Sequence, residues 1–172
     1  LRIHDVALEA GINNATLHYY FPPKETLIQG VVDALIEEFA RERGPQQQTL
    51  AANALEELRI EFEDVRRRFR ENPEQILVAT ELLVRSLRDP AIAPIFGQLD
   101  SGWRGYLKSM IARGIQQGIF RPDLDQEVSA TVIMVLIKGF GYQFMNRTNL
   151  DIADDVLEMI QKQVEAMLKT QD

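Results

Sequence analysis

Several side chains that can form hydrogen bonds are crowded into one short stretch near the start of the chain. They are Asn14, Thr16, His18, Tyr19, Tyr20 and Lys24. Asparagine, threonine and tyrosine bind phosphate oxygens and base edges, and a threonine methyl packs against the methyl group of thymine. A lysine at the start of a helix lies beside free backbone N–H groups, and the two together favour a phosphate. These residue types therefore predict a surface that contacts duplex DNA.

Two short helices are expected to position this surface. The apolar spacing predicts a helix over 3–10, and Gly11 ends it because glycine adopts a left-handed conformation without strain. Asn13 is a good N-cap for a second helix over 14–20, and Pro22 prevents that helix from continuing. Two helices joined by a short turn that contains glycine form a helix-turn-helix, whose second helix enters the major groove of DNA.

A second interpretation of the same residues stays open. Pairs of short helices around a glycine are common, and aromatic side chains at helical spacing more often pack in a core. The net charge of −7 counts against a protein that binds polyanions in general. The basic run over 65–71 is interpreted as a solvated helix face, because nearby acidic residues offset it. An acidic chain can still carry a compact DNA-reading domain, so composition does not decide between the two interpretations.

The remainder of the chain shows helical periodicity and no convincing alternating strand, which predicts an all-α fold. The expected helices cover 24–43, 49–70, 74–88, 99–117, 126–146 and 152–169. Pro94 and Gly97 are interpreted as breaks before the helix over 99–117. The linker that begins at Gly44 is the best domain boundary. It separates an N-terminal domain with its connecting helix, 1–43, from a helical domain over 46–172.

The residue types that most enzymes and metal sites require are missing or misplaced. The chain contains no cysteine, which excludes disulfides and thiolate chemistry and agrees with a cytoplasmic location. There is no nucleophile elbow or phosphate-binding loop, and His4 and His18 lie far along the chain from the acidic helices. The longest apolar run, 130–137, is too short to span a bilayer. We therefore expect no catalytic residues, no metal, no cofactor and no membrane partner.

The last two predicted helices carry more apolar surface than one small domain needs. Between Val128 and Ile137 the helix over 126–146 is apolar almost all round, and such a helix must be covered on both sides. The helix over 152–169 carries an apolar stripe. A second copy of the chain is the simplest cover, which predicts a homodimer with a four-helix interface. The alternative is that both helices belong to the core of a monomer.

Large side chains spread over the C-terminal helices predict a small-molecule pocket with a mainly apolar lining. The candidate ligand-binding residues are Phe62, Glu81, Arg85, Phe96, Trp103, Tyr106, Met110, Met134 and Phe140. The alternative for each aromatic residue alone is an ordinary place in the core. Glu81 and Arg85 either pair with each other at the surface or direct one charged group inward. The expected effector is uncharged or amphipathic, with aromatic or acyl character.

The stretch DVALEAGINNATLHYYFPPKETLI resembles the helix-turn-helix signature of the TetR family of transcriptional regulators. The residues that match the family pattern are Val6, Ala7, Ala10, Gly11, Ile12, Thr16, Leu17, Tyr20, Phe21, Lys24, Glu25 and Leu27. A weaker similarity lies in ARGIQQGIFRPDLD, which resembles the loop before the dimerising helices of the family. The resemblance implies an N-terminal helix-turn-helix domain, followed by a C-terminal domain that binds a ligand and dimerises.

The resemblance also implies a function. Regulators of this family bind operator DNA as homodimers, and most are repressors that a small effector releases from the operator. We therefore expect a ligand-responsive repressor with double-stranded operator DNA as its partner and an apolar or amphipathic effector. The alternative is a helical ligand-binding or scaffold dimer that does not read DNA.

The chain departs from the family pattern at several positions. The first helix of the family's DNA-binding domain is absent, so the chain is expected to be N-terminally truncated. Arg2 stands where a threonine or serine cap is usual, and His18 replaces a tyrosine. Asn13 replaces the common serine, but asparagine caps a helix equally well.

Overall fold

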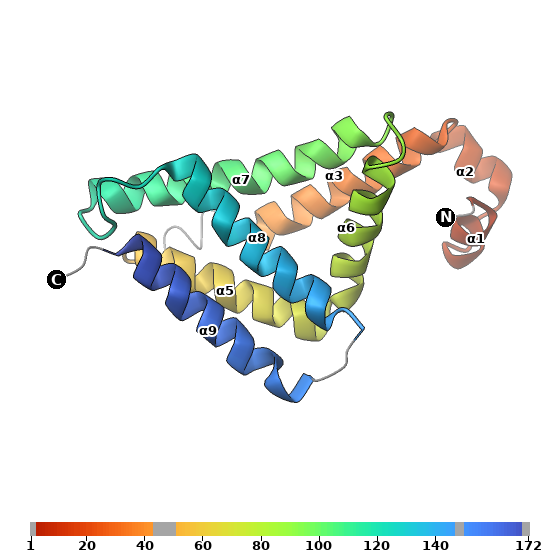
Figure 1. Cartoon of the computed structure of the whole chain (residues 1–172). Coiled ribbons are helices and arrows are strands. Elements are labelled where there is room, and N and C mark those ends of the chain that lie inside the picture. The colour runs from red at the N-terminus through yellow and green to blue at the C-terminus, as the bar shows by residue number, and fades with distance from the viewer. Residues whose placement is uncertain (1–2, 43–50, 147–149, 170–172) are drawn as a thin grey trace.

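The computed structural model describes residues 3–42, 51–146 and 150–169, and it consists of helices joined by short connections (Figure 1). The helices are α1 (Ile3–Glu9), α2 (Asn14–Tyr20), α3 (Lys24–Glu42), α5 (Ala54–Glu71), α6 (Pro73–Ser86), α7 (Ala93–Gln116), α8 (Gln126–Phe144), the 3₁₀ helix η1 (Leu150–Ile152) and α9 (Ala153–Leu168). These described ranges contain no strand, so the predicted all-α fold is confirmed. No helix in them is long and apolar enough to cross a lipid bilayer.

The start of α7 differs most from the prediction, because this helix begins at Ala93. The interpretation of Pro94 and Gly97 as breaks is wrong. Pro94 lies in the first turn, where no helical hydrogen bond needs its missing N–H group. Gly97 costs only intrinsic helix propensity, about 1 kcal/mol, which tertiary packing readily offsets. The predicted linker at Gly44 lies outside the described residues.

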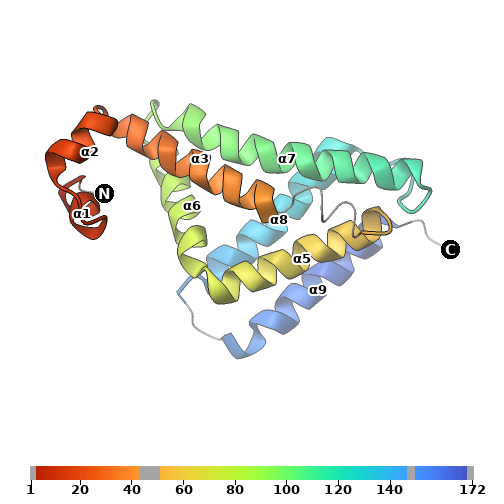
Figure 2. The same cartoon turned by 180° about the vertical axis from the view of Figure 1, so that it is seen from behind.

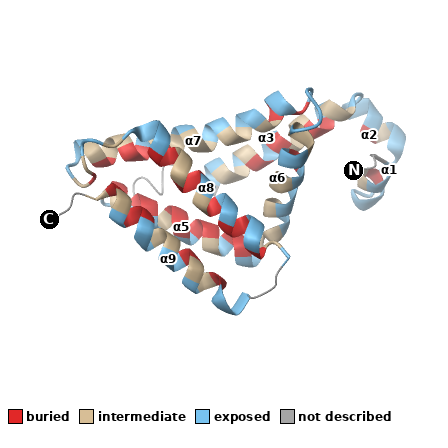
Figure 3. Ribbon diagram, in the orientation of Figure 1, coloured by how far each residue is buried: buried red, intermediate tan, exposed pale blue. Residues whose placement is uncertain are grey.

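Four helices of the C-terminal region share one core. Helices α5, α7, α8 and α9 contribute its fully buried side chains, among them Leu58, Phe62, Met110, Ile133 and Leu157. Figure 3 shows the buried residues on the sides of these helices that face one another, with exposed residues on the outer sides. This pattern follows from the amphipathic spacing of the sequence, because each helix buries its apolar stripe against its neighbours.

Helix α3 joins this helical body to the two short helices at the other end of the molecule. It lies along α7, while α1 and α2 lie beyond α6, as Figures 1 and 2 show from opposite sides. Ile28, Val32 and Leu35 of α3 are buried in a second apolar cluster with Leu82 and Ile92. The packed face of α3 therefore couples its position to α6 and to the start of α7.

Buried acidic residues of α5 bind groups on α7. Glu57 accepts a hydrogen bond from Arg113 Nη2 at 2.7 Å, and its side chain is only 6% exposed. Glu61 accepts one from Trp103 Nε1 at 2.9 Å. Because buried carboxylates are costly without partners, these contacts fix the register of α5 against α7.

A close backbone approach shapes the end of α7. The chain leaves this helix through Gly118, whose φ of 69° is the left-handed conformation that favours glycine. The N–H groups of Ile119 and Phe120 donate to the carbonyl of Gly114 at 3.0 Å. The buried Phe120 ring consequently lies directly on Gly114, and a Cβ added there would be 2.7 Å from Phe120 Cγ. Only glycine fits at this position.

An ion-pair network joins α5 to α9 and makes the fold sensitive to acid. Glu165 accepts hydrogen bonds from Arg59 at 2.8 Å, Lys169 at 2.9 Å and Gln161 at 3.1 Å. The Arg59 bond is the largest cause that lowers the pKa of Glu165 to about 2, while burial acts in the opposite direction. A lowered pKa means that folding favours the charged carboxylate.

We expect the contribution of Glu165 to stability to be complete above about pH 5 and to be lost as the pH falls towards 2. Denaturant unfolding at a series of pH values should show that Glu165→Gln flattens this part of the stability profile. Glu158→Gln is the matched control, because Glu158 pairs with Lys162 at the surface, with its side chain 55% exposed, and contributes little. Equal profiles for the two variants would contradict the assignment.

Candidate functional site

The first two helices form a compact helix-turn-helix. Gly11 has a φ of 66° between α1 and α2, and the Ile12 N–H group donates to the carbonyl of Ala7 at 2.9 Å. Ala7, Leu17 and Leu27 are buried together and hold α1, α2 and the start of α3. Since α2 buries only its Leu17 face, its other side is left open to solvent.

The residues predicted to contact DNA lie on this open side or next to it. Asn14 and His18 are exposed, and Tyr19 and Tyr20 are 80% and 67% exposed. Their rings meet edge to face with centroids 5.2 Å apart. The half-buried side chains of Thr16 in α2 and Lys24 at the start of α3 complete the set. The structure thus brings all six predicted residues to one end of the molecule, and their contact with DNA stays a prediction.

Asn13 fixes the start of α2. Its side-chain oxygen accepts hydrogen bonds from the Thr16 backbone N–H at 2.7 Å and from the Thr16 hydroxyl at 3.0 Å. An N-cap of this kind satisfies backbone donors that no helical carbonyl reaches. The cap matters more in α2 than in a long helix, because α2 has only 7 residues.

We expect Asn13→Ala to destabilise α2 by about 1 kcal/mol and to weaken DNA binding in a gel-shift titration. Asn13→Ser is the matched control, since serine keeps an oxygen that caps the helix. If the alanine and serine variants bind DNA equally well, the capping interaction has no role in presenting α2.

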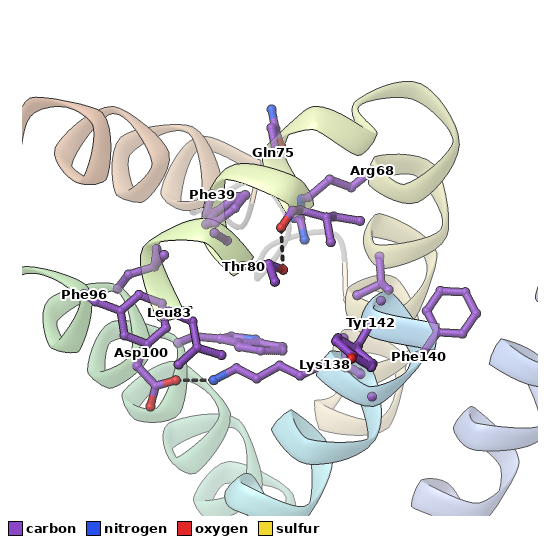
Figure 4. A pocket seen from close by; sticks show the side chains of 18 residues that line it. Phe39, Arg68, Gln75, Thr80, Leu83, Phe96, Asp100, Lys138, Phe140 and Tyr142 are labelled. Atoms are coloured by element: carbon purple, nitrogen blue, oxygen red, sulfur yellow. Dashed lines mark hydrogen bonds and ion pairs between the residues drawn. The ribbon is translucent and has the colours of Figure 1, made fainter. Parts of the chain in front are cut away.

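A cavity of about 420 Å³ lies among α3, α5, α6, α7 and α8. Its lining residues are Phe39, Val65, Arg68, Gln75, Ile76, Ala79, Thr80, Leu83, Phe96, Leu99, Asp100, Trp103, Ile137, Lys138, Gly139, Phe140, Gly141 and Tyr142. Figure 4 shows aromatic rings from several helices around the cavity and a few polar groups at its edges. This size and this mainly apolar lining are typical of small-molecule sites, which measure about 300–1,000 Å³.

Three of the predicted ligand-binding residues line this cavity, namely Phe96, Trp103 and Phe140. The others do not. Phe62, Met110 and Met134 are buried in the core, and Tyr106 packs against it. Glu81 and Arg85 form an i, i+4 ion pair with a 2.9 Å contact, and the Glu81 side chain is 63% exposed. Phe62, Tyr106, Met110 and Met134 pack in or against the core because their positions along the helices direct them between α5, α7, α8 and α9. Glu81 and Arg85 stay at the surface because water stabilises their charges.

The cavity also contains charged residues that sequence reasoning missed. Arg68 belongs to the basic run interpreted as a solvated face, but it is only 8% exposed and its guanidinium carbon lies 4.5 Å from the centroid of the Phe39 ring. That part of the interpretation is wrong. Asp100 of α7 and Lys138 of α8 form an ion pair at the cavity. Burial raises the pKa of Asp100, but hydrogen bonds from Lys138 and Arg104 outweigh it and hold that pKa below the usual value.

The outer sides of α8 and α9 carry a row of exposed apolar side chains. They are Val128, Val135 and Tyr142 on α8, Ile152 just before α9, and Met159 on α9. Their exposed fractions range from 47% for Ile152 to 76% for Tyr142. On α8 the spacing is seven residues, which places these side chains on one face of the helix, as in paired helices. Apolar residues gathered in this way are typical of an interaction surface.

Within the described ranges, no group of three or more His, Asp or Glu side chains is placed to hold a metal ion. Around the cavity, Asp100 and Lys138 pair with each other and the Thr80 hydroxyl donates to the Ile76 carbonyl, whereas the buried Gln75 Oε1 has no hydrogen-bond partner among the residues that the structure describes. The arrangement combines a helix with exposed hydrogen-bonding side chains at one end of the molecule and a mainly apolar cavity within the helical body.

Comparisons with known proteins agree with this arrangement. A family model described as "BetI-type transcriptional repressor, C-terminal" matches residues 56–169. No curated protein matches the chain by sequence. A transcriptional regulator from Saccharomonospora viridis, solved in complex with choline, is 26% identical with a TM-score of 0.77, over 99% of this chain and 88% of that chain.

Two further structures are similar in fold. A TetR regulator from Haloarcula marismortui is 24% identical with a TM-score of 0.76, over 98% of this chain and 88% of that chain. A TetR-family regulator from Agrobacterium tumefaciens is 18% identical with a TM-score of 0.83, over 99% of this chain and 87% of that chain. These similar proteins are transcriptional regulators and not enzymes. The match over the C-terminal region, together with the helix-turn-helix before it, shows that this chain belongs to the TetR family of transcriptional regulators.

Proposed function

We propose that the protein is a homodimeric repressor that binds operator DNA in the cytoplasm and is released by a small apolar or amphipathic effector. In this proposal residues 1–43 form the DNA-binding domain with its connecting helix, and residues 46–172 form the ligand-binding and dimerisation domain. The observation that carries the proposal is the course of α3. This helix starts at Lys24 beside α2, and Phe39 near its other end lines the cavity.

The exposed side of α2 supports DNA reading. Tyr19, Tyr20, Asn14 and His18 are free to reach base edges and phosphates, because the buried Leu17 side anchors the helix from behind. Two such helices in a dimer must lie about 34–36 Å apart to enter successive major grooves. The apolar row on α8 and α9 supports pairing of two chains, which sets that distance.

The cavity supports effector control through α3. A ligand at Phe39 contacts α3 directly, and Ile28, Val32 and Leu35 of the same helix are packed against the helical body. A ligand that prefers one position of α3 changes the separation of the two α2 helices and thereby the affinity for DNA. The effect is reciprocal, so bound DNA must lower the affinity for the effector by the same factor.

Selection of binding sites from random duplex DNA, followed by shift assays at several salt concentrations, tests this function. We expect a palindromic site and binding that weakens with salt. Effector candidates, including choline because a similar structure contains it, are then titrated into the complex. Ligand binding without any selected DNA site would favour the alternative, a helical ligand-binding dimer that does not read DNA.

Replacing Lys24 tests whether the end of the molecule that carries α2 binds DNA, as distinct from an effect of overall charge on DNA affinity. We expect Lys24→Gln to weaken binding to all DNA sequences similarly and to reduce the salt slope by about 1 per contacted phosphate. Lys108→Gln is the control, because Lys108 lies on α7 and pairs with Glu127 of α8. A reduced slope in the control alone would place the DNA surface elsewhere.

A further inference from the structure

One ion pair joins α7 to α8 across the edge of the cavity. The Lys138 side chain reaches from α8 to the Asp100 carboxylate on α7, and both residues line the cavity (Figure 4). The Lys138 ammonium lies 6.0 Å from the centroid of the Trp103 ring. The apolar space and this charged pair are therefore in direct contact.

The two members of this pair do not depend on each other equally. Asp100 also accepts a hydrogen bond from Arg104 Nη2 at 2.8 Å. Arg104 is held in turn by the Thr131 hydroxyl at 2.6 Å and lies 3.5 Å from Glu127. Among the described residues, Lys138 has Asp100 as its only carboxylate partner. Loss of the pair thus leaves Asp100 with a cation but leaves Lys138 without an anion.

This asymmetry decides which charge a ligand can bring. A ligand anion that binds Lys138 replaces Asp100, and every charged group keeps a partner because Asp100 remains with Arg104. A ligand cation that binds Asp100 instead displaces Lys138, which then lies near the new cation and has no carboxylate partner of its own among the described residues. The Lys138 side chain is 43% exposed, so water offsets part of this loss, but a charge with an ionic partner is still favoured over one without, and the first exchange is preferred.

The remaining charged residue of the cavity lining, Arg68, also favours an anionic over a cationic ligand. Arg68 and Lys138 are cationic and Asp100 is anionic, which leaves a formal excess of one positive charge among the lining residues. Arg68 lies across the cavity from Lys138, with its guanidinium over the Phe39 ring (Figure 4). The aromatic rings therefore already have cations beside them, and a cationic ligand gains less from those rings.

We propose that the cavity binds an amphipathic anion, whose carboxylate-type head group takes the place of Asp100 at Lys138 and whose apolar tail lies along Trp103, Phe96 and Phe140. This inference rests on the proposed function of the cavity as the effector site. It adds the charge of the effector and the residue that selects it. Binding opens the α7–α8 ion pair while the Asp100–Arg104 pair stays closed, so the ligand changes the contact between these two helices.

Probes with one tail and different head groups test the charge. The chain has one tryptophan, Trp103, and it lines the cavity, so its fluorescence reports binding directly. The intact protein is titrated with decanoate, decanol and decyltrimethylammonium, which share one tail, below micelle formation, and with choline as a cation that lacks the tail. We expect decanoate to bind at least about tenfold more tightly than decanol, the gain that a charge-assisted hydrogen bond gives. Decyltrimethylammonium and choline are expected to bind more weakly than decanol.

Two substitutions are expected to act in opposite directions on decanoate. Lys138→Gln removes the head-group partner and is expected to weaken decanoate about tenfold, with decanol unchanged. Asp100→Asn removes the competing carboxylate and is expected to tighten decanoate binding. Lys108→Gln, which breaks another α7–α8 ion pair away from the cavity, is expected to change neither.

The outcomes separate this inference from the proposed function. Equal or tighter binding of the neutral or cationic probes, or unchanged decanoate binding in Lys138→Gln, overturns the anionic effector while the cavity remains the effector site. A fluorescence response to none of the probes overturns both. Selective decanoate binding that leaves the complex with DNA intact supports the charge preference and contradicts control of DNA binding by the cavity.

Discussion

Replacing Val135 with glutamate is expected to separate the dimer into monomers and to remove most of the affinity for operator DNA. Val135 is 62% exposed in the single chain and lies between Val128 and Tyr142 in the apolar row of α8. In the proposed dimer this position is covered, and each copy of the variant would then bury an unpaired carboxylate. We expect the dimer dissociation constant to rise by about 100-fold or more. Sedimentation equilibrium measures the change.

The matched control for this prediction is Val84→Glu. Val84 is a valine of comparable exposure, 41%, but it lies on α6, away from the row on α8 and α9. We expect this variant to stay dimeric and to bind DNA normally. A dimer that survives Val135→Glu, with both variants folded by circular dichroism, would show that chains pair through another surface or not at all.

Gly114→Ala is expected to destabilise the fold strongly. A Cβ at this position overlaps the Phe120 ring, which is only 1% exposed and has core side chains on its other side. The ring cannot move away without opening the turn at Gly118, whose hydrogen bonds end α7. Overpacking of this kind costs about 1–3 kcal/mol and sometimes more. Chemical denaturation gives the free energy of unfolding directly.

Gly105→Ala in the same helix is the control. A Cβ at Gly105 meets no atom within 4 Å, so alanine brings better helix propensity without a clash. We expect this variant to gain up to about 1 kcal/mol in stability. Opposite signs for two identical substitutions in α7 would establish the contact between Gly114 and Phe120, and equal signs would contradict it.

The sequence predicted the helix-turn-helix well because its signals are local. Gly11 is the turn residue, Asn13 caps α2, and Leu17 marks the buried side, all within a few positions of each other. Amphipathic spacing predicted the longer helices for the same reason. The start of α7 was wrong, because proline is tolerated in a first turn and the pattern alone does not say where that turn lies.

The cavity was harder to predict, because it depends on how five helices pack. Trp103 and Phe62 are equally good candidates by residue type, but only Trp103 lines the cavity. Arg68 was missed since its neighbours in the basic run, Arg67 and Arg70, are exposed. Lys138 and Asp100 are separated by 38 positions, and no local pattern pairs them.

Because α3 is long, a small tilt of this helix at the cavity displaces its Lys24 end, beside α2, by a larger distance. The helix has 19 residues, which corresponds to about 28 Å at 1.5 Å per residue. If it pivots near Phe39, the arm from there to Lys24 is about 22 Å long, and a tilt of about 5° moves the Lys24 end by roughly 2 Å. Motion of this size in each of two arms is large compared with the tolerance of a hydrogen bond. On the proposed mechanism, release of DNA therefore requires no large rearrangement of the helical body around the cavity.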